Sequence, residues 1–158
     1  MHPRFVDQIE RLMDAVEAER QRQAKPGLAS ASTKLLAAII RLSMDEIPRD
    51  PGRKEYRQGS TLGEHRKHWF RAKFGGGRFR LFYRFRTDLR IILYVWVNDE
   101  QTLRTYGSRT DAYAVFSRML DSGNPPDDWE TLLAAARSGQ TTTRVEALAK
   151  RMGSERAD

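Results

Sequence analysis

The stretch 64–86 places basic side chains between aromatic ones in an order that suits the binding of a polyanion. The glycines 75–77 divide it into two expected strands, 67–74 and 78–86. Because side chains alternate along a strand, one face of this hairpin collects cations; these are Arg71, Lys73, Arg78, Arg80, Arg84 and Arg86. Such a row predicts a site for phosphate groups.

The turn decides which cations meet across the hairpin. A four-residue turn, 74–77, pairs Lys73 with Arg78 and Arg71 with Arg80, and it separates charged from apolar surface. A three-residue turn would place Arg80 on the face opposite Arg71. Like charges directly opposite one another destabilise a sheet, so we expect an anion to occupy this face.

Charge is concentrated in one region of the 158-residue chain, whose net charge is +7. Residues 53–86 hold eleven Lys and Arg against two acids, Glu55 and Glu64. This favours nucleic acid as the partner; an acidic protein is the alternative. The chain has no cysteine, which excludes disulfides and thiolate chemistry. No membrane-spanning segment or signal peptide is expected, and we expect a cytoplasmic location.

The hydrophobic pattern predicts helices before and after the strands. An amphipathic helix over 3–24 ends at Lys25-Pro26-Gly27, and a second helix begins at Ser30 or Ser32. The nearly continuous apolar run 90–97 predicts a strand covered on both faces.

Two further helices are expected after the strands. Ser108 or Thr110 is expected to cap one, and Asp127, with Glu130 three residues on, to cap the next. The order predicts an α+β fold: an N-terminal helical hairpin packed on a small antiparallel sheet, followed by C-terminal helices. We expect one domain over 1–137 and a mobile tail over 138–158.

Several blocks of sequence resemble the YhaV family of toxins, within the RelE-like superfamily. They are Glu55-Tyr56-Arg57-Gln58-Gly59, Thr61-Leu62-Gly63, Lys67-His68-Trp69-Phe70-Arg71-Ala72-Lys73-Phe74, Phe79-Arg80-Leu81-Phe82-Tyr83-Arg84, Trp96-Val97-Asn98-Asp99-Glu100, Tyr106-Gly107-Ser108-Arg109-Thr110-Asp111-Ala112-Tyr113 and Pro125-Pro126-Asp127-Asp128-Trp129. The resemblance implies an endoribonuclease toxin of a type II toxin–antitoxin system. It implies that mRNA is cleaved, commonly on translating ribosomes, by attack of the ribose 2′-OH without a metal or other cofactor.

The resemblance also implies partners and site residues. The partners are mRNA and a PrlF-type antitoxin with an AbrB-like DNA-binding domain, so operator DNA is bound only through the antitoxin complex. Arg71-x-Lys73 and Arg80 match the spacing of catalytic cations in RelE-like toxins. Arg104 and Tyr106 are the nearest candidates for the arginine and tyrosine that follow the last strand, with Arg109 or Tyr113 as alternatives.

The chemistry of RNA cleavage assigns expected roles to these side chains. Arg71, Lys73 and Arg80 supply charge to the phosphate, Lys73 is a candidate base or acid, and Tyr106 is a candidate for stacking on a base. Further RNA contacts are expected from Arg66, Lys67, Arg78, Arg84 and Arg109. Supporting roles are expected for His68, Asn98, Asp99 and Glu100, the last three by holding Arg80 or Arg104 in place through ion pairing. No metal site is expected.

A second class of function fits the same charge pattern. A basic module that binds nucleic acid without cleaving it would also show salt-sensitive affinity. The two classes differ in whether removing a candidate catalytic residue abolishes cleavage or only weakens binding.

Overall fold

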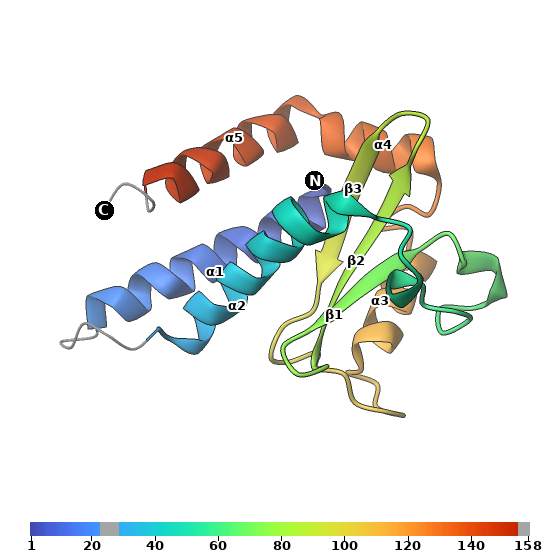
Figure 1. Cartoon of the computed structure of the whole chain (residues 1–158), viewed down its shortest axis with the longest axis horizontal. Helices are drawn as coiled ribbons and strands as arrows, with labels where there is room; N and C mark the ends of the chain where they lie inside the picture. Colours follow the sequence, from blue (N-terminus) through green and yellow to red (C-terminus); the bar gives the residue numbers. More distant parts are fainter. Residues whose placement is uncertain (23–28, 155–158) are drawn as a thin grey trace.

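The computed structural model describes residues 1–22 and 29–154 and has the expected α+β order (Figure 1). The predicted helix end at 25–27 lies outside the described residues. The elements are α1 (Pro3–Arg22), α2 (Ala31–Arg41), η1 (Leu42–Glu46), η2 (Ile47–Arg49), η3 (Lys54–Tyr56), η4 (Glu64–Arg66), β1 (Phe70–Phe74), β2 (Phe79–Arg86), β3 (Ile91–Val97), α3 (Ala112–Asp121), α4 (Trp129–Arg137) and α5 (Gly139–Ser154).

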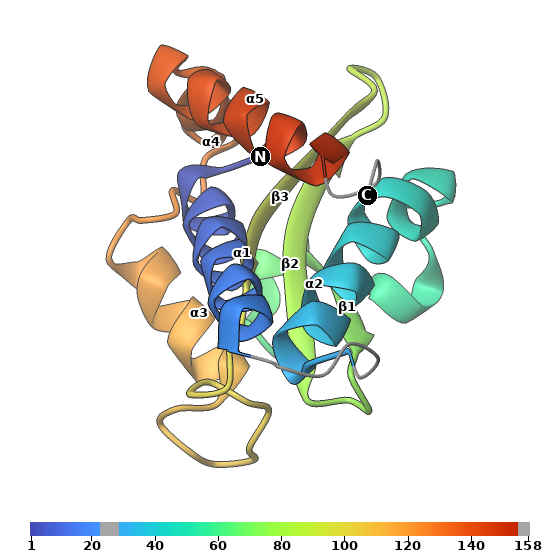
Figure 2. The same ribbon diagram turned by 90° about the vertical axis from the view of Figure 1, so that its left-hand side faces the viewer.

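The three strands form an antiparallel meander in the order β1-β2-β3, with helices on both faces (Figures 1 and 2). Leu81 and Tyr83 of β2 pack toward α1 and α2 with Phe5 and Ile9. On the other face, Phe82 packs with α3 and α4. This confirms that β3 lies in a sheet covered on both sides. Among the described residues, no helix is long and apolar enough to cross a membrane.

The predicted register of the β1–β2 hairpin is wrong by two residues. Lys73 lies opposite Arg80, and Arg71 lies opposite Phe82. The connection is 75–78, closed by the pair Phe74 and Phe79, whose ring centroids are 5.4 Å apart. A shift of two residues leaves every side chain on its predicted face because the period of a strand is two.

Helix caps agree with the prediction at one helix and differ at two. Ser30 caps α2, and its side chain accepts a hydrogen bond from the backbone N–H of Thr33. Asp111 caps α3 in place of Ser108 or Thr110, and Asp128 caps α4 in place of Asp127. Both carboxylates accept a backbone N–H of the first helical turn, which is what an N-cap must do.

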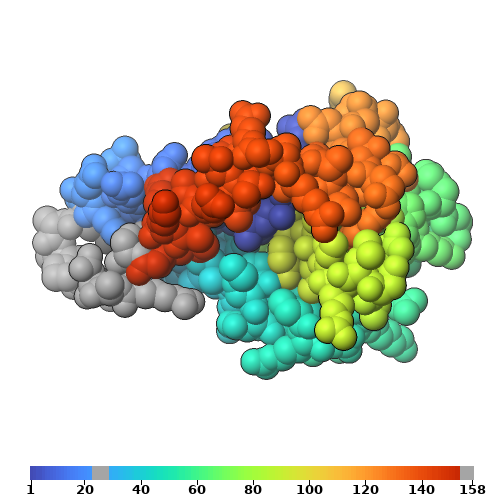
Figure 3. All heavy atoms as spheres, turned by 90° about the horizontal axis from the view of Figure 1, so that it is seen from above, coloured from blue at the N-terminus to red at the C-terminus, as the bar shows by residue number. Residues whose placement is uncertain are grey.

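The mobile tail expected over 138–158 is corrected for the part that the structure describes, since α5 is a packed helix. Figure 3 shows α5 lying over α1. Arg144 binds Asp7 at 2.6 Å and Glu10 at 2.7 Å, and Leu148 is 3% exposed within the core around α1 and α2. Contacts separated by more than 130 residues hold the helix in place, and the local polar sequence does not reveal them.

Replacing Leu148 by alanine is expected to lower the free energy of unfolding by about 2 kcal/mol, because it removes a buried side chain and leaves a cavity. Urea denaturation measures this. Glu146→Ala, an exposed change on the same helix, is the control and should leave stability unchanged. Equal stability of the Leu148 variant and the control would show that α5 does not pack in solution.

Candidate active site

Two strands and one helix bring the candidate cleavage residues together beside the β1–β2 turn. β1 carries Arg71 and Lys73, and β2 carries Arg80 directly opposite Lys73. Alternation turns Arg71 and Arg80 toward the sheet face that packs on α3. There both meet Tyr113, which lies in the first turn of α3.

The hydroxyl group of Tyr113 joins the two arginines. It accepts a hydrogen bond from Arg71 Nε at 2.7 Å and another from Arg80 Nε at 3.2 Å. Arg71 Nη1 also donates to the carbonyl oxygen of Glu55 at 2.5 Å. Arg80 Nη1 donates to the carbonyl oxygens of Gly77 at 2.7 Å and Phe79 at 2.9 Å. Each guanidinium is therefore fixed in orientation by hydrogen bonds at Nε and Nη1.

These contacts leave donors for a ligand. Within the described residues, the Nη2 groups of Arg71 and Arg80 have no hydrogen-bond partner. Both Nη2 groups are accessible to solvent. Lys73 is exposed and has no acidic partner among the described residues. Two fixed guanidiniums beside an exposed ammonium form a suitable site for a phosphate that gains negative charge during a reaction.

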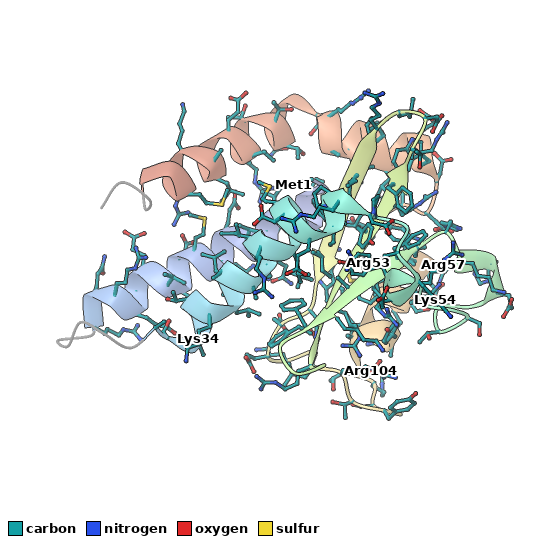
Figure 4. All side chains as sticks on the ribbon, in the orientation of Figure 1. Met1, Lys34, Arg53, Lys54, Arg57 and Arg104 are labelled. Carbon is teal, nitrogen blue, oxygen red and sulfur yellow. The ribbon has the colours of Figure 1, made fainter. Side chains whose placement is uncertain are left out.

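Arg104 and Tyr106 form the outer part of the site, on the loop after β3, where Figure 4 labels Arg104. Arg104 forms an ion pair with Asp111, and its guanidinium carbon lies 4.1 Å from the ring centroid of Tyr106 and 4.9 Å from that of Tyr113. The side chain is thus held against both tyrosine rings. Tyr106 itself is 91% exposed, so its ring is open to a nucleobase.

Asp111 supports this arrangement from beneath. Its carboxylate accepts hydrogen bonds from the backbone N–H of Thr105 at 2.7 Å and of Tyr113 at 3.0 Å, and it pairs with Arg104. Burial acts to raise the pKa of Asp111, but these hydrogen bonds and the Arg104 charge outweigh it and hold the pKa below the usual 3.8. One side chain thereby fixes both the start of α3 and the position of Arg104.

Replacing Asp111 by asparagine is expected to lower the free energy of unfolding at pH 7 by about 1–2 kcal/mol. Because the pKa of Asp111 is lower in the folded than in the unfolded protein, its ionised carboxylate stabilises the fold at pH values above the unfolded-state pKa. This contribution is lost as the pH falls through the folded-state pKa. The difference between wild type and variant should therefore shrink below about pH 4. Urea midpoints at pH 7 and pH 3 measure this. Asp45→Asn, at an exposed position, is the control; a difference independent of pH would contradict the assignment.

Asn98 holds the start of β2, while among the described residues its two acidic neighbours form no ion pair with Arg80 or Arg104. Asn98 Oδ1 accepts the backbone N–H of Arg80 at 2.5 Å, and its Nδ2 donates to the carbonyl of Arg78 at 3.1 Å. Asp99 accepts hydrogen bonds from its own turn, and Glu100 is exposed. The ion pair expected of these acids is made to Arg104 by Asp111.

His68 lies away from this cluster. Its Nε2 is 2.7 Å from Asp127 Oδ1, which also accepts the indole N–H of Trp69 at 2.6 Å. Burial acts to raise the pKa of Asp127, but the hydrogen bonds from His68 and Trp69 outweigh this effect and lower it. His68 therefore ties the start of β1 to the segment before α4.

The five basic residues expected to contact RNA fall into two groups. Arg66 is buried and binds Asp121 at 2.7 Å, Lys67 binds Glu64 at 2.5 Å, and Arg84 donates to the carbonyl oxygen of Asp127 at 2.5 Å. Burial lowers the pKa of Arg84, whose guanidinium lies against two tryptophan rings. Arg78 and Arg109 are exposed, as Lys67 is, but neither forms an ion pair with a described residue.

Two members of the site had little support from the sequence. Tyr113 was only an alternative for the tyrosine role, and Asp111 had no predicted role. A signal existed for Asp111, since Asp is among the preferred N-cap residues and an apolar helical pattern follows it.

Among residues 1–22 and 29–154, no three His, Asp or Glu side chains are grouped to hold a metal ion.

Fold and site together define an α+β protein with a fixed arginine–tyrosine cluster suited to phosphate chemistry. The sequence model of a family described as a toxin with endonuclease activity, of a toxin–antitoxin system (YhaV), matches residues 1–137. The chain is 44% identical over 132 residues to the ribonuclease toxin YhaV of Escherichia coli K12, covering 83% of this chain and 86% of that protein. The toxins YhaV of strains O157:H7 and CFT073 give the same identity over the same shares of each chain.

No solved structure matches the chain. The family match over most of the length, with the relatives at 44% identity, shows that the chain belongs to the YhaV toxin family.

Proposed function

We propose that this chain is the toxin of a type II toxin–antitoxin system and acts as an endoribonuclease on mRNA. Family membership supports the reaction class. The observation that carries the proposal is the pair of guanidiniums whose Nε groups share the Tyr113 hydroxyl. Cations that are already held in position stabilise the charge that develops on a phosphate, because they need not reorganise during the reaction.

The proposed reaction is attack by the ribose 2′-oxygen on the adjacent phosphorus, with no metal ion involved. The bond from the 2′-oxygen to phosphorus forms while the bond to the 5′-oxygen breaks, which gives a 2′,3′-cyclic phosphate and a free 5′-OH. The Nη2 groups of Arg71 and Arg80 bind the non-bridging oxygens. Lys73, exposed opposite Arg80, takes the 2′-OH proton or supplies one to the leaving 5′-oxygen, and water takes or supplies the other proton.

The outer residues position the substrate. The exposed Tyr106 ring stacks on a base next to the cleaved bond, and Arg104 beneath it keeps the ring in place. In the same proposal, cleavage takes place on the ribosome in the cytoplasm. A PrlF-type antitoxin with an AbrB-like domain neutralises the toxin and links it to operator DNA.

End-mapping of mRNA in a translation reaction tests the proposal. We expect discrete cuts with 5′-OH and 2′,3′-cyclic phosphate ends, dependent on added ribosomes, and their loss in the Lys73→Met variant. Cuts with 5′-phosphate ends would overturn the proposed mechanism. Intact mRNA with translation still blocked would favour a basic module that binds without cleaving, the second candidate that the charge supports.

A further inference from the structure

Exposed cations of the described residues differ in whether they have an acidic partner. Several arginines that looked available in the sequence pair with acids, as Arg66 does with Asp121 and Arg86 with Asp88. A group of three on the loop before β1 behaves differently. Arg53, Lys54 and Arg57, which we call the basic loop, are all exposed, and none forms an ion pair with a described residue.

The basic loop is anchored to the core by Tyr56, which lies between its cations, and by Gln58, which directly follows them. Tyr56 is buried, and its ring packs edge-on against Tyr83 with centroids 6.0 Å apart. Gln58 is also buried; it donates to the carbonyl of Arg66 at 2.9 Å and accepts the backbone N–H of Leu62 at 3.0 Å. The loop is therefore held by buried contacts while its cations stay in solvent.

A short turn separates two of these cations. Lys54 begins the 3-10 turn η3, and the backbone N–H of Arg57 donates to the carbonyl of Lys54 at 3.2 Å. Arg57 directly follows this turn, so one turn of backbone separates the two side chains. Figure 4 shows the labelled Arg53, Lys54 and Arg57 on the same loop beside β1, with Lys34 apart from them on α2.

A direct contact joins the basic loop to the candidate active site. The carbonyl oxygen of Glu55, inside the loop, accepts the 2.5 Å hydrogen bond from Arg71 Nη1. Arg57 also forms a β-bridge with Phe70, the first residue of β1. A strand of RNA held at Arg71 that continues past the outer edge of β1 would therefore meet these cations next.

We propose that the basic loop binds the phosphates of the single-stranded RNA segment flanking the cleaved bond. This rests on the proposed function and extends it to a second contact, outside the catalytic cluster. RNA is favoured over an acidic protein segment because the loop is hydrogen-bonded to Arg71, which binds the scissile phosphate in the proposed function. Backbone cations of this kind raise affinity regardless of sequence and make it depend on salt.

The test measures binding of an RNA oligomer whose 2′-OH groups are methylated, so that it cannot be cleaved. For Lys54→Ala/Arg57→Ala we expect affinity about 10-fold weaker at 0.1 M salt, and a slope of log affinity against log salt smaller by about 1.4. A dinucleotide should bind equally well to variant and wild type. The matched control is Arg137→Ala/Lys150→Ala, which removes two exposed cations from α4 and α5 and should change neither.

The outcomes separate this inference from the proposed function. If wild type cleaves RNA and the loop variant binds the oligomer as wild type does, the basic loop is not an RNA site. If the loop variant loses affinity for polyglutamate but not for RNA, the loop serves an acidic protein and the inference is overturned. If wild type cleaves nothing while the loop variant still weakens oligomer binding, the RNA site stands and the nuclease proposal fails.

Discussion

Replacing Arg80 by alanine is expected to lower the rate of RNA cleavage by about 10³-fold while the protein stays folded. Arg80 is 5% exposed, and Tyr113, Gly77 and Phe79 fix its guanidinium through Nε and Nη1. The remaining Nη2 group can therefore meet a phosphate without reorganising. Its loss removes a charge from the transition state, and single-turnover cleavage measures the effect.

Two further variants make the Arg80 result interpretable. The Arg86→Ala change removes a cation from the same strand, one that pairs with Asp88. This variant should cleave at the wild-type rate. Arg80→Lys keeps the charge but loses the planar fork, so it should recover only a small part of the activity. The Arg80→Ala change leaves the carbonyl groups of Gly77 and Phe79 without the Arg80 donor. Circular dichroism and thermal melting are therefore needed to establish that the variant is folded. A folded Arg80→Ala protein with wild-type cleavage would remove Arg80 from the mechanism.

The side-chain faces of the sheet could be predicted from the sequence, whereas the pairing register could not. Alternation together with a four-residue turn assigns Arg71 and Arg80 to one face, and a shift of two residues preserves this assignment. The register depends on the turn, where Gly75, Gly76 and Gly77 all adopt positive φ angles. Three consecutive glycines permit several turn geometries, so their sequence does not select one.

The sequence also could not distinguish a cation that faces solvent from one that another element covers. Arg66 and Arg84 lie in the same basic stretch as Arg71, but their partners, Asp121 and Asp127, come from α3 and the segment before α4. Arg144 likewise finds its acids on α1. Such pairs are fixed by the tertiary arrangement and leave no periodic pattern in the sequence.

Replacing Tyr113 by phenylalanine is expected to lower the cleavage rate by about 10²-fold with little change in RNA affinity. The ring is retained, so its edge-on contact with Phe82 and its contact with Arg104 remain. The hydroxyl that accepts the Nε groups of Arg71 and Arg80 is lost. Both guanidiniums keep their charge but lose a shared anchor, so the rate falls more than the affinity does.

The measurement separates positioning from stability. Cleavage rates at saturating RNA and affinity for the uncleavable oligomer are compared between Tyr113→Phe and Tyr94→Phe. Tyr94→Phe also removes a buried tyrosine hydroxyl, one that donates to the carbonyl of Ser43 at 2.5 Å on the opposite side of the sheet. It should cost stability without slowing cleavage. If both variants lose stability equally and cleave equally well, Tyr113 is only a core residue, and Arg71 and Arg80 are held well enough by their backbone carbonyl partners.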